Sequence, residues 1–500
     1  MEIQIPYSII FTFICFLFLI RKLSNSKKPS KPLPPGPPKL PLIGNLHQLA
    51  GSLPHRRLRD LANKYGPLMY LQLGETSNVV VTSPEIVKEI TKSHDQTFTN
   101  RPKILVSEIL AYNSTDMTFS PYGSYWRLLR KICTLELLSV KRVQTFRKIR
   151  EEEVSQAVKF IGEHEGSPVN LGKIIPPITS SIVARAAFGK KTEIVEQILS
   201  TIEYTLEVAS AFMISDLYPS LKSIINPISW ARYKVAKAHR RVDSLLDTII
   251  DDHKGKKEID VDGEANEDLI DVLLRVQKQN SNNEVTLTLE NIKGVILDIF
   301  VGGTETAATT IEWAMSELMN HPEAMKKAQA EVRSVYGSKG YVDESEFHQL
   351  KYVQAVLRET LRLHPPGALL VPRENSETCE INGYEIPANS RVLINAWAIG
   401  RDPNYWSEAE KFRPERFVDN AIDYKGGNLE FIPFGFGRRI CPGISFAAPV
   451  LHLILSNLLY HYDWKFPKGT SEIEMAEAFG ATVRRKNDLC VVPILYSANN

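Results

Sequence analysis

The sequence contains little cysteine and almost no net charge. Its five cysteines lie far apart and none belongs to a Cys-x-x-Cys pair. This spacing excludes a disulfide framework and a common zinc site, and it indicates a reducing compartment. The 60 basic residues are balanced by 58 acidic ones, which leaves a formal charge of +2. A chain without a basic block is not expected to bind nucleic acid.

A long apolar run is found at the N-terminus. It extends from Ile5 to Ile20, and basic residues begin at once with Arg21. The run is near the lower limit of the roughly 17–25 residues that cross a bilayer. A cleaved signal peptide is the alternative, but Glu2 stands where such a peptide carries positive charge. We therefore predict an anchor helix over residues 1–23, with the rest of the chain on the cytosolic side.

Residues 24–41 form a basic and proline-rich segment. Its second half reads Lys-Pro-Leu-Pro-Pro-Gly-Pro-Pro-Lys-Leu-Pro. Proline fixes φ and lacks an amide donor, so we expect a stiff extended linker. A ligand for a proline-binding domain is the alternative, but the position between an anchor and a globular start favours a spacer. Residues 42–500 are predicted to form one large domain.

That domain is predicted to be mainly α with a small β subdomain. Leu71–Leu73 and Val79–Thr82 are typical of paired strands, and most of the remaining chain has helical periodicity.

The stretch from Phe434 to Gly443 reads Phe-Gly-Phe-Gly-Arg-Arg-Ile-Cys-Pro-Gly and fits the pattern F-x-x-G-x-R-x-C-x-G at every position. Gly437 and Gly443 tolerate positive φ, so the loop can turn tightly and point its amides at the Cys441 sulfur. A thiolate held in this way can be an axial ligand of haem iron, and Arg439 can pair with a haem propionate. A structural cysteine beside a glycine turn is the alternative for a lone Cys-Pro-Gly, but the complete string favours a haem ligand.

This string resembles the haem-binding loop of the cytochrome P-450 superfamily of haem-thiolate monooxygenases. Four motifs occur in that family's order and, with the anchor and linker, extend the resemblance over essentially the full length. The finer pattern is similar to the plant microsomal A-type group, the seventy-one clan, and most similar to its terpenoid-oxidising branch. The resemblance implies the cytochrome P-450 fold behind an N-terminal transmembrane anchor helix, with residues 42–500 as the haem-thiolate catalytic domain.

A long apolar helix is predicted from Thr288 to Asn320, where His-Pro ends it. Its centre reads Gly302-Gly-Thr-Glu-Thr306, and each glycine costs roughly 1 kcal/mol inside a helix. Close helix packing is one explanation. The other, which the resemblance supports, is that the glycines open the backbone for O₂ while Glu305 and Thr306 relay protons to it as catalytic residues. Ala307 stands where the family usually has Thr or Ser, which puts an auxiliary hydroxyl in doubt.

The resemblance also implies which residues contact the haem and the substrate. Trp126 and Arg130 lie four apart on one helical face, and the family uses such a pair at a propionate. The expected cofactor contacts are Trp126, Arg130, Arg373, Phe434, Arg439 and Gly443. The expected substrate-pocket residues, which are equally compatible with ordinary core, are Val301, Gly302, Leu369, Leu370 and Phe479.

Glu359 and Arg362 lie three apart on another helix, which alone indicates an exposed pair of little energetic value. The resemblance implies instead that Arg416 joins them in a buried structural network.

The implied activity is insertion of one oxygen atom of O₂ into a lipophilic molecule, with haem b bound by Cys441. No dinucleotide or flavin fingerprint follows a strand, so electrons from NADPH have to arrive through a separate NADPH-cytochrome P-450 reductase in the endoplasmic reticulum membrane. Four basic residues are expected to meet this acidic partner, namely Arg127, Lys131, Lys141 and Arg142. The expected substrate is a sesquiterpene or diterpene, and an unsaturated fatty acid is the alternative. Phenolic or alkaloid substrates, a haem-thiolate isomerase or dehydratase, and a non-enzymatic haem protein are further alternatives.

Overall fold

The computed structural model describes residues 31–51, 53–189, 193–209, 213–256, 267–279, 286–418 and 420–497. The predicted anchor over 1–23 and the start of the linker, 24–30, lie outside the described residues. Residues 31–41 contain no helix, and their one ladder contact is a bridge between Leu40 and Gly44, as expected for an extended segment.

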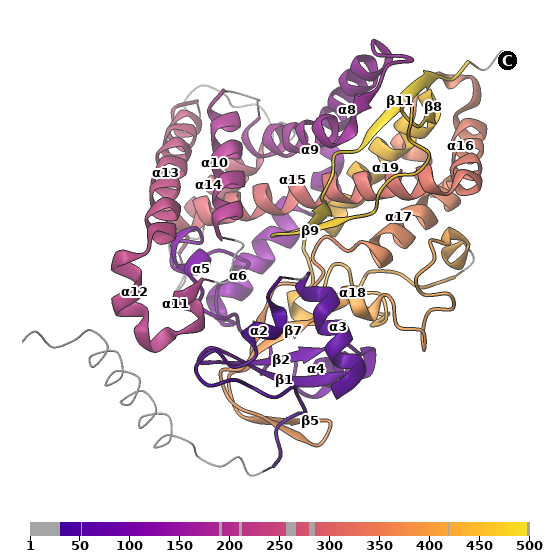
Figure 1. The fold of residues 1–500 in the computed structure, drawn as a ribbon. Helices are drawn as coiled ribbons and strands as arrows, with labels where there is room; N and C mark the ends of the chain where they lie inside the picture. The colour runs from indigo at the N-terminus through magenta and orange to yellow at the C-terminus, as the bar shows by residue number, and fades with distance from the viewer. Residues whose placement is uncertain are drawn as a thin grey trace, which may run out of the picture.

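Helices make up most of the described chain (Figure 1). The longer ones are α3 (Pro54–Tyr65), α4 (Pro84–Ser93), α6 (Ser124–Ile132), α8 (Arg147–Gly162), α9 (Leu171–Phe188), α10 (Glu193–Ala209), α13 (Trp230–Lys256), α14 (Leu269–Gln279), α15 (Leu289–Asn320), α16 (Pro322–Tyr336), α17 (Lys351–Leu363) and α19 (Ile444–His461). The shorter ones are α2 (Leu46–Leu49), α5 (Leu105–Ile109), α7 (Val140–Thr145), α11 (Ile214–Leu217), α12 (Lys222–Ile228) and α18 (Ala396–Ile399).

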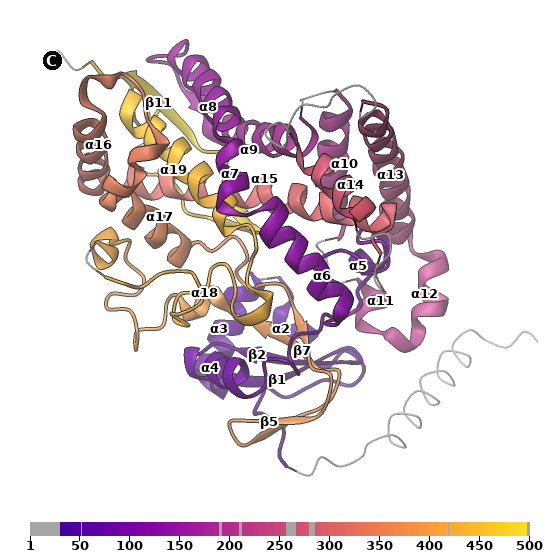
Figure 2. The same cartoon turned by 180° about the vertical axis from the view of Figure 1, so that it is seen from behind.

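Helix α15 runs through the centre of this helical body and confirms the helix predicted over Thr288–Asn320. Thr288 Oγ1 accepts from the amide of Asn291 at 3.2 Å, and the Asn291 side chain accepts in return from the Thr288 amide at 2.9 Å. This reciprocal cap starts the helix, and Pro322 ends it. Helix α15 packs against α9 on one side and against α17 and α19 on another. Figure 2 shows α6 and α19 on the same side of it.

A small sheet forms the β subdomain below the helices in Figure 1. Strand β1 (Leu68–Leu73) pairs antiparallel with β2 (Thr76–Val81), which confirms the predicted strand pair except for Thr82, one residue past the end of β2. Strand β7 (Arg391–Ile394) adds to β2 in parallel, and β4 (Arg373–Glu374) closes the edge. The other strands are β3 (Val169–Asn170), β5 (Cys379–Ile381), β6 (Tyr384–Ile386), β8 (Tyr462–Lys465) and β11 (Cys490–Leu495), besides the pair β9 (Glu477–Phe479) and β10 (Val483–Arg485).

The β9–β10 hairpin carries Phe479, one of the residues expected to line the substrate pocket. It is ordered because Trp313 of α15 donates its indole N–H to the carbonyl of Val483 at 3.0 Å. The hairpin is therefore fixed to the central helix.

Helix α19 is the one helix of the described residues that is long and apolar enough to cross a membrane. More than half of its most apolar window is buried inside the protein, 56%, as in the core helix of a soluble domain. It starts directly after the cysteine loop, which it holds against α15.

Candidate active site

Cys441 lies in a tight loop just before α19. The Cys441 amide donates to the carbonyl of Phe434 at 2.9 Å, and the Gly443 amide donates to the Cys441 sulfur at 3.3 Å. Gly437 has φ of +62°, as the sequence suggests, and a Cβ there would lie 2.8 Å from a carboxylate oxygen of Asp95. Gly443 has φ of −81°, so its amide matters rather than its conformation. The other residue of the loop with positive φ is Gly435, at +77°, which was not expected from the sequence motif.

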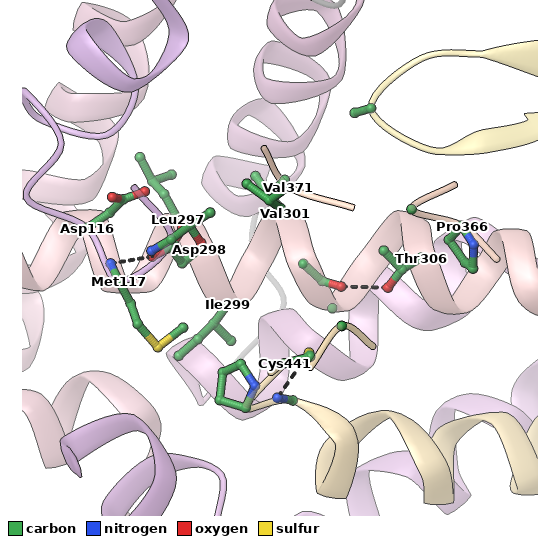
Figure 3. Close-up of a pocket in the computed structure, with 18 of the residues that line it drawn as sticks. Asp116, Met117, Leu297, Asp298, Ile299, Val301, Thr306, Pro366, Val371 and Cys441 are labelled. Atoms are coloured by element: carbon green, nitrogen blue, oxygen red, sulfur yellow. Dashed lines mark hydrogen bonds between the residues drawn. The ribbon is translucent and has the colours of Figure 1, made fainter. Parts of the chain in front are cut away.

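The sulfur faces a cavity of about 480 Å³. Figure 3 shows Cys441 on one side of it and Ile299, Val301 and Thr306 of α15 on the other. Burial raises the pKa of the Cys441 thiol, against the smaller lowering effects of the Gly443 amide and of Arg130. A metal ion in the cavity would favour the thiolate form of this sulfur.

The predicted pocket residues divide into two groups. Val301, Gly302 and Leu370 line the cavity as expected. Leu369 does not, because it lies in a turn, with Leu370 at φ of +51° and its amide bonded to the Gly367 carbonyl at 3.0 Å, and Leu369 packs instead with the cluster around α3 and β1. Phe479 does not line it either: its ring stacks on His55 with centroids 5.9 Å apart, outside the cavity.

Four arginines line the cavity, of which Arg101 was missed by the sequence analysis. Arg439 is buried and donates three of its five N–H groups to backbone carbonyls, those of Thr99, Met117 and Ser120, so it too keeps donors that could reach a propionate. Burial, together with the charge of Arg373, lowers the pKa of Arg439 to about 9.

Arg373 and Arg130 keep donors that the protein does not use. Arg373 donates one guanidinium nitrogen to the carbonyl of Phe436 at 2.6 Å, and its other terminal nitrogen, Nη1, is buried without a partner. The Arg130 guanidinium makes no hydrogen bond with the described residues. Trp126 differs from expectation: its indole N–H donates to the Met117 carbonyl at 3.0 Å, and its ring supports the Arg439 guanidinium at 4.3 Å. Trp126 therefore offers the cavity its ring rather than its N–H.

Two carboxyl groups, Asp116 and Asp298, also line the cavity. Burial, and then the charge of Asp298, raise the pKa of Asp116 well above its ordinary range, and burial raises that of Asp298 as well. Asp298 accepts from the amides of Met117 and Thr118 at 2.8 and 3.2 Å, and Asp116 accepts from the amide of Phe119 at 2.8 Å. Because two neighbouring buried carboxyl groups resist ionising together, they neutralise only part of the arginine charge.

These residues fit a haem. A haem brings two propionates, which are the acceptors that the unused Arg373 and Arg130 donors require. Its iron is the positive partner that the Cys441 sulfur lacks. The fit rests on unpaired donors and on the sulfur's environment, and both belong to the same cavity.

Comparison with known proteins agrees with this geometry. The chain belongs to the cytochrome P-450 family, whose sequence model matches residues 34–491. As a member, it is a monooxygenase that uses haem b, O₂ and electrons taken from NADPH by a separate reductase.

Among relatives, it is 53% identical to cytochrome P-450 71D10 of Glycine max, over 97% of this chain and 96% of the relative. It is 48% identical to tabersonine 16-hydroxylase 1 of Catharanthus roseus, with 99% of both chains covered, and 48% identical to premnaspirodiene oxygenase of Hyoscyamus muticus, with 97% of both covered. A zebra fish cytochrome P-450 structure with progesterone has the same fold, with a TM-score of 0.78 at 23% identity over 89% of this chain and 100% of that one.

The two glycines at the centre of α15 have different roles. A Cβ at Gly303 would lie 2.9 Å from a methyl carbon of Val183, so this glycine allows α9 and α15 to pack closely. A Cβ at Gly302 would meet nothing within 4 Å, and this glycine faces the cavity. Close helix packing therefore explains Gly303, and the opening of the backbone for O₂ at Gly302 stays a prediction.

The two candidate proton-relay residues are held by different partners. The Thr306 hydroxyl donates to the carbonyl of Gly302 at 2.6 Å. One oxygen of Glu305 accepts from the hydroxyl of Thr482 at 2.7 Å. Thr482 was not singled out in the sequence, because nothing near it indicates a partner 177 residues away.

The Glu359–Arg362–Arg416 network is present and buried. Arg362 binds both oxygens of Glu359, at 2.7 and 2.8 Å, and Arg416 binds one of them at 3.0 Å. Glu359 is 0% exposed and Arg362 is 1% exposed. The remaining Arg362 donors reach the carbonyls of Gly400, Ala409 and Lys411.

The basic residues proposed for partner docking lie on or near α6 and α7. Arg127, Lys131 and Lys141 are exposed. Arg142 is half-buried and bonded to Glu267, so it is not free to meet a partner.

Proposed function

We propose that the protein is a single-pass endoplasmic reticulum monooxygenase that hydroxylates or epoxidises a sesquiterpene or diterpene. For hydroxylation, RH, O₂, NADPH and one proton give ROH, NADP⁺ and water. The observation that carries the proposal is the amide-bonded Cys441 sulfur facing a cavity whose arginines keep unpaired donors.

We assign the haem contacts to residues at the cavity wall. Cys441 is the iron ligand, and Arg130 and Arg373 hold the propionates with the donors that the protein leaves free. Arg439 can reach a propionate with its two remaining N–H groups, Trp126 supports its guanidinium, and Phe434 and Gly443 hold the loop in shape. When bound, the haem supplies the iron at which O₂ is activated.

Glu305 and Thr306 deliver the protons that this chemistry requires. Both lie on α15 beside Gly302, where the helix backbone is open to the cavity. The Thr306 hydroxyl holds a proton at Oγ1, and the free oxygen of Glu305 accepts protons from water and passes them on. Ala307 is buried and offers no second hydroxyl.

The substrate assignment rests on the wall of the cavity away from Cys441. This wall is lined by aliphatic side chains, among them Val106, Leu110, Ile202, Val242 and Leu297. Such a surface favours a lipophilic substrate with few polar groups. The relative named premnaspirodiene oxygenase supports a terpenoid substrate, and the equally similar tabersonine 16-hydroxylase 1 makes an alkaloid the second candidate.

Two measurements on the full chain in microsomal membranes test this function. The reduced, carbon-monoxide-treated protein should show the long-wavelength Soret band of thiolate-bound haem, and added reductase should give NADPH-dependent O₂ uptake. A thiolate band without O₂ uptake would indicate an isomerase or dehydratase instead. The absence of the band from intact protein would overturn the assignment of Cys441.

A spectral titration with a panel of ligands tests the substrate class. The panel consists of sesquiterpene and diterpene olefins, tabersonine and an unsaturated fatty acid. The terpenoids should give the type I shift at the lowest concentration, and preference for tabersonine or the fatty acid would replace the terpenoid assignment. Retention in the membrane after carbonate extraction, with the folded domain open to added protease, tests the proposed topology.

A further inference from the structure

The inference concerns Thr482 and rests on the proposed role of Glu305. Thr482 lies between β9 and β10, is buried, and lines the cavity next to Ala481. Its hydroxyl donates to a carboxylate oxygen of Glu305 at 2.7 Å. One side chain therefore contacts both the space for the substrate and a proposed proton-relay group.

The hairpin that carries Thr482 is held at several points. Trp313, which is 0% exposed, binds the Val483 carbonyl at 3.0 Å, and Arg485 binds the Ser316 hydroxyl at 2.9 Å. On the opposite side, the Val483 amide donates to the carbonyl of Pro366 at 2.9 Å. Because the backbone on both sides is fixed, the Thr482 hydroxyl has a defined position relative to α15.

Glu305 has few other restraints. Among the described residues, it takes part in no ion pair, and the Thr482 hydroxyl makes the one hydrogen bond to its side chain. Thr306 cannot replace this donor, because its own hydroxyl is given to Gly302 at 2.6 Å. Without Thr482, the Glu305 side chain would be free to change rotamer.

We infer that Thr482 is a positioning residue for proton delivery: it fixes one oxygen of Glu305, leaves the other for proton transfer, and links that carboxylate to the cavity wall that the substrate touches. The alternative is a purely structural role, in which the Thr482 hydroxyl only forms a hydrogen bond that a buried polar group requires. The two roles predict different effects on catalysis, because a positioning residue acts through Glu305 and a purely structural residue does not.

The first test is hydrogen exchange of the haem-loaded protein without substrate, followed by mass spectrometry over residues 477–485. Loss of the hydrogen bond in Thr482→Val and in Glu305→Ala should speed exchange of the hairpin about fivefold. Thr482→Ser and Glu305→Gln keep a donor and an acceptor, so they should exchange like the parent protein. Exchange in Thr482→Val that equals the parent protein would overturn the inference without recourse to activity.

The second test measures product formed per NADPH consumed, with reductase and premnaspirodiene as the probe. Thr482→Val should lower this ratio about tenfold, as expected for loss of a hydrogen bond to a charged group. Thr482→Ser should restore it to within about twofold, and Thr470→Val, an exposed threonine before the hairpin, serves as the matched control. The concentration of premnaspirodiene that gives half of the type I shift should stay within about twofold of the parent value, since valine preserves the wall.

A double-mutant cycle completes the argument. If Thr482 acts through Glu305, adding Thr482→Val to Glu305→Gln should change the ratio by less than about twofold. Independent, multiplicative losses would show that Thr482 acts as a wall residue and would overturn the inference. Absence of the thiolate band in the parent protein would overturn the proposed function instead, and the exchange experiment would still decide the position of Thr482.

Discussion

The protein has two buried clusters of arginine, and only one of them is complete. Around Glu359, the carboxylate and the surrounding carbonyls satisfy every donor of Arg362. At the cavity, four arginines lie with only two carboxyl groups, Asp116 and Asp298, and Arg373 keeps a buried donor without a partner. The fold itself satisfies the donors of the first cluster, and we propose that the haem propionates satisfy those of the second.

Because of this difference, we expect the two clusters to affect different steps, folding of the chain for the first and binding of haem for the second. The Glu359 network contributes to stability as soon as the chain folds. The buried arginines of the cavity destabilise the haem-free protein, because their charges are desolvated and incompletely paired. Part of the free energy of haem binding would offset this destabilisation. Substitutions in the Glu359 cluster should therefore lower the stability of the protein with or without haem, whereas substitutions in the cavity cluster should mainly weaken haem binding.

The largest effect is expected for Glu359→Ala. It leaves two buried arginines without their carboxylate, at a cost of roughly 3–5 kcal/mol in unfolding free energy, with or without haem. Haem occupancy and chemical unfolding of the purified domain measure this cost. The matched control is Glu323→Ala, an exposed residue of α16 that should change stability by less than about 0.5 kcal/mol. Normal haem occupancy in Glu359→Ala would contradict the comparison.

A smaller and more selective effect is expected for Arg130→Met. The haem-free protein should keep its stability to within about 0.5 kcal/mol, because the guanidinium binds no other described group. Haem release should be at least about tenfold faster, because one donor to a charged propionate is lost. Transfer of haem to apomyoglobin measures the rate. Equal haem release by both proteins would remove Arg130 from the propionate site.

The Asp116–Asp298 pair provides a prediction on pH. The raised pKa values mean that the folded protein holds a proton that the unfolded chain releases above about pH 4. Stability is therefore lost as pH rises towards the folded pKa, by about 1.4 kcal/mol for each unit of the shift.

Asp116→Asn tests this prediction. The amide supplies a permanent donor to Asp298 and keeps an acceptor for the Phe119 amide, which lies 2.8 Å from Asp116. The decline in unfolding free energy between pH 5 and pH 8 should be smaller in this variant. The exposed Asp252→Asn is the control. The same slope in all three proteins would exclude a shared proton.

The smallest effect is expected for the exposed basic residues of α6 and α7. Reversing the charge of exposed Lys131 and Lys141 should slow electron transfer from reductase about tenfold at low salt and less at high salt. Stopped-flow reduction measures the rate, with Lys326→Glu on α16 as the control. Unchanged rates would place the docking surface elsewhere.

Local patterns in the sequence predicted what lies close together along the chain. The cysteine loop, the capped helix α15 and the Glu359–Arg362 pair are each contained in a short stretch, and the structure has the loop, the helix and the pair where they were expected. Arg101, Asp116 and Thr482 carry no such pattern. Their partners come from segments that are distant in the sequence. Phe479 was wrongly expected to line the cavity for a related reason: the turn of the β9–β10 hairpin decides which of its residues face the cavity, and the local sequence does not show this.

The close packing at Gly303 limits how this enzyme can diversify. A methyl group added there would lie 2.9 Å from a methyl carbon of Val183, so a larger residue at position 303 would force α9 and α15 to shift relative to each other. We expect the substrate preference to change more readily by mutation at other parts of the cavity wall, such as the turn around Leu370 and the tip of the hairpin at Ala481.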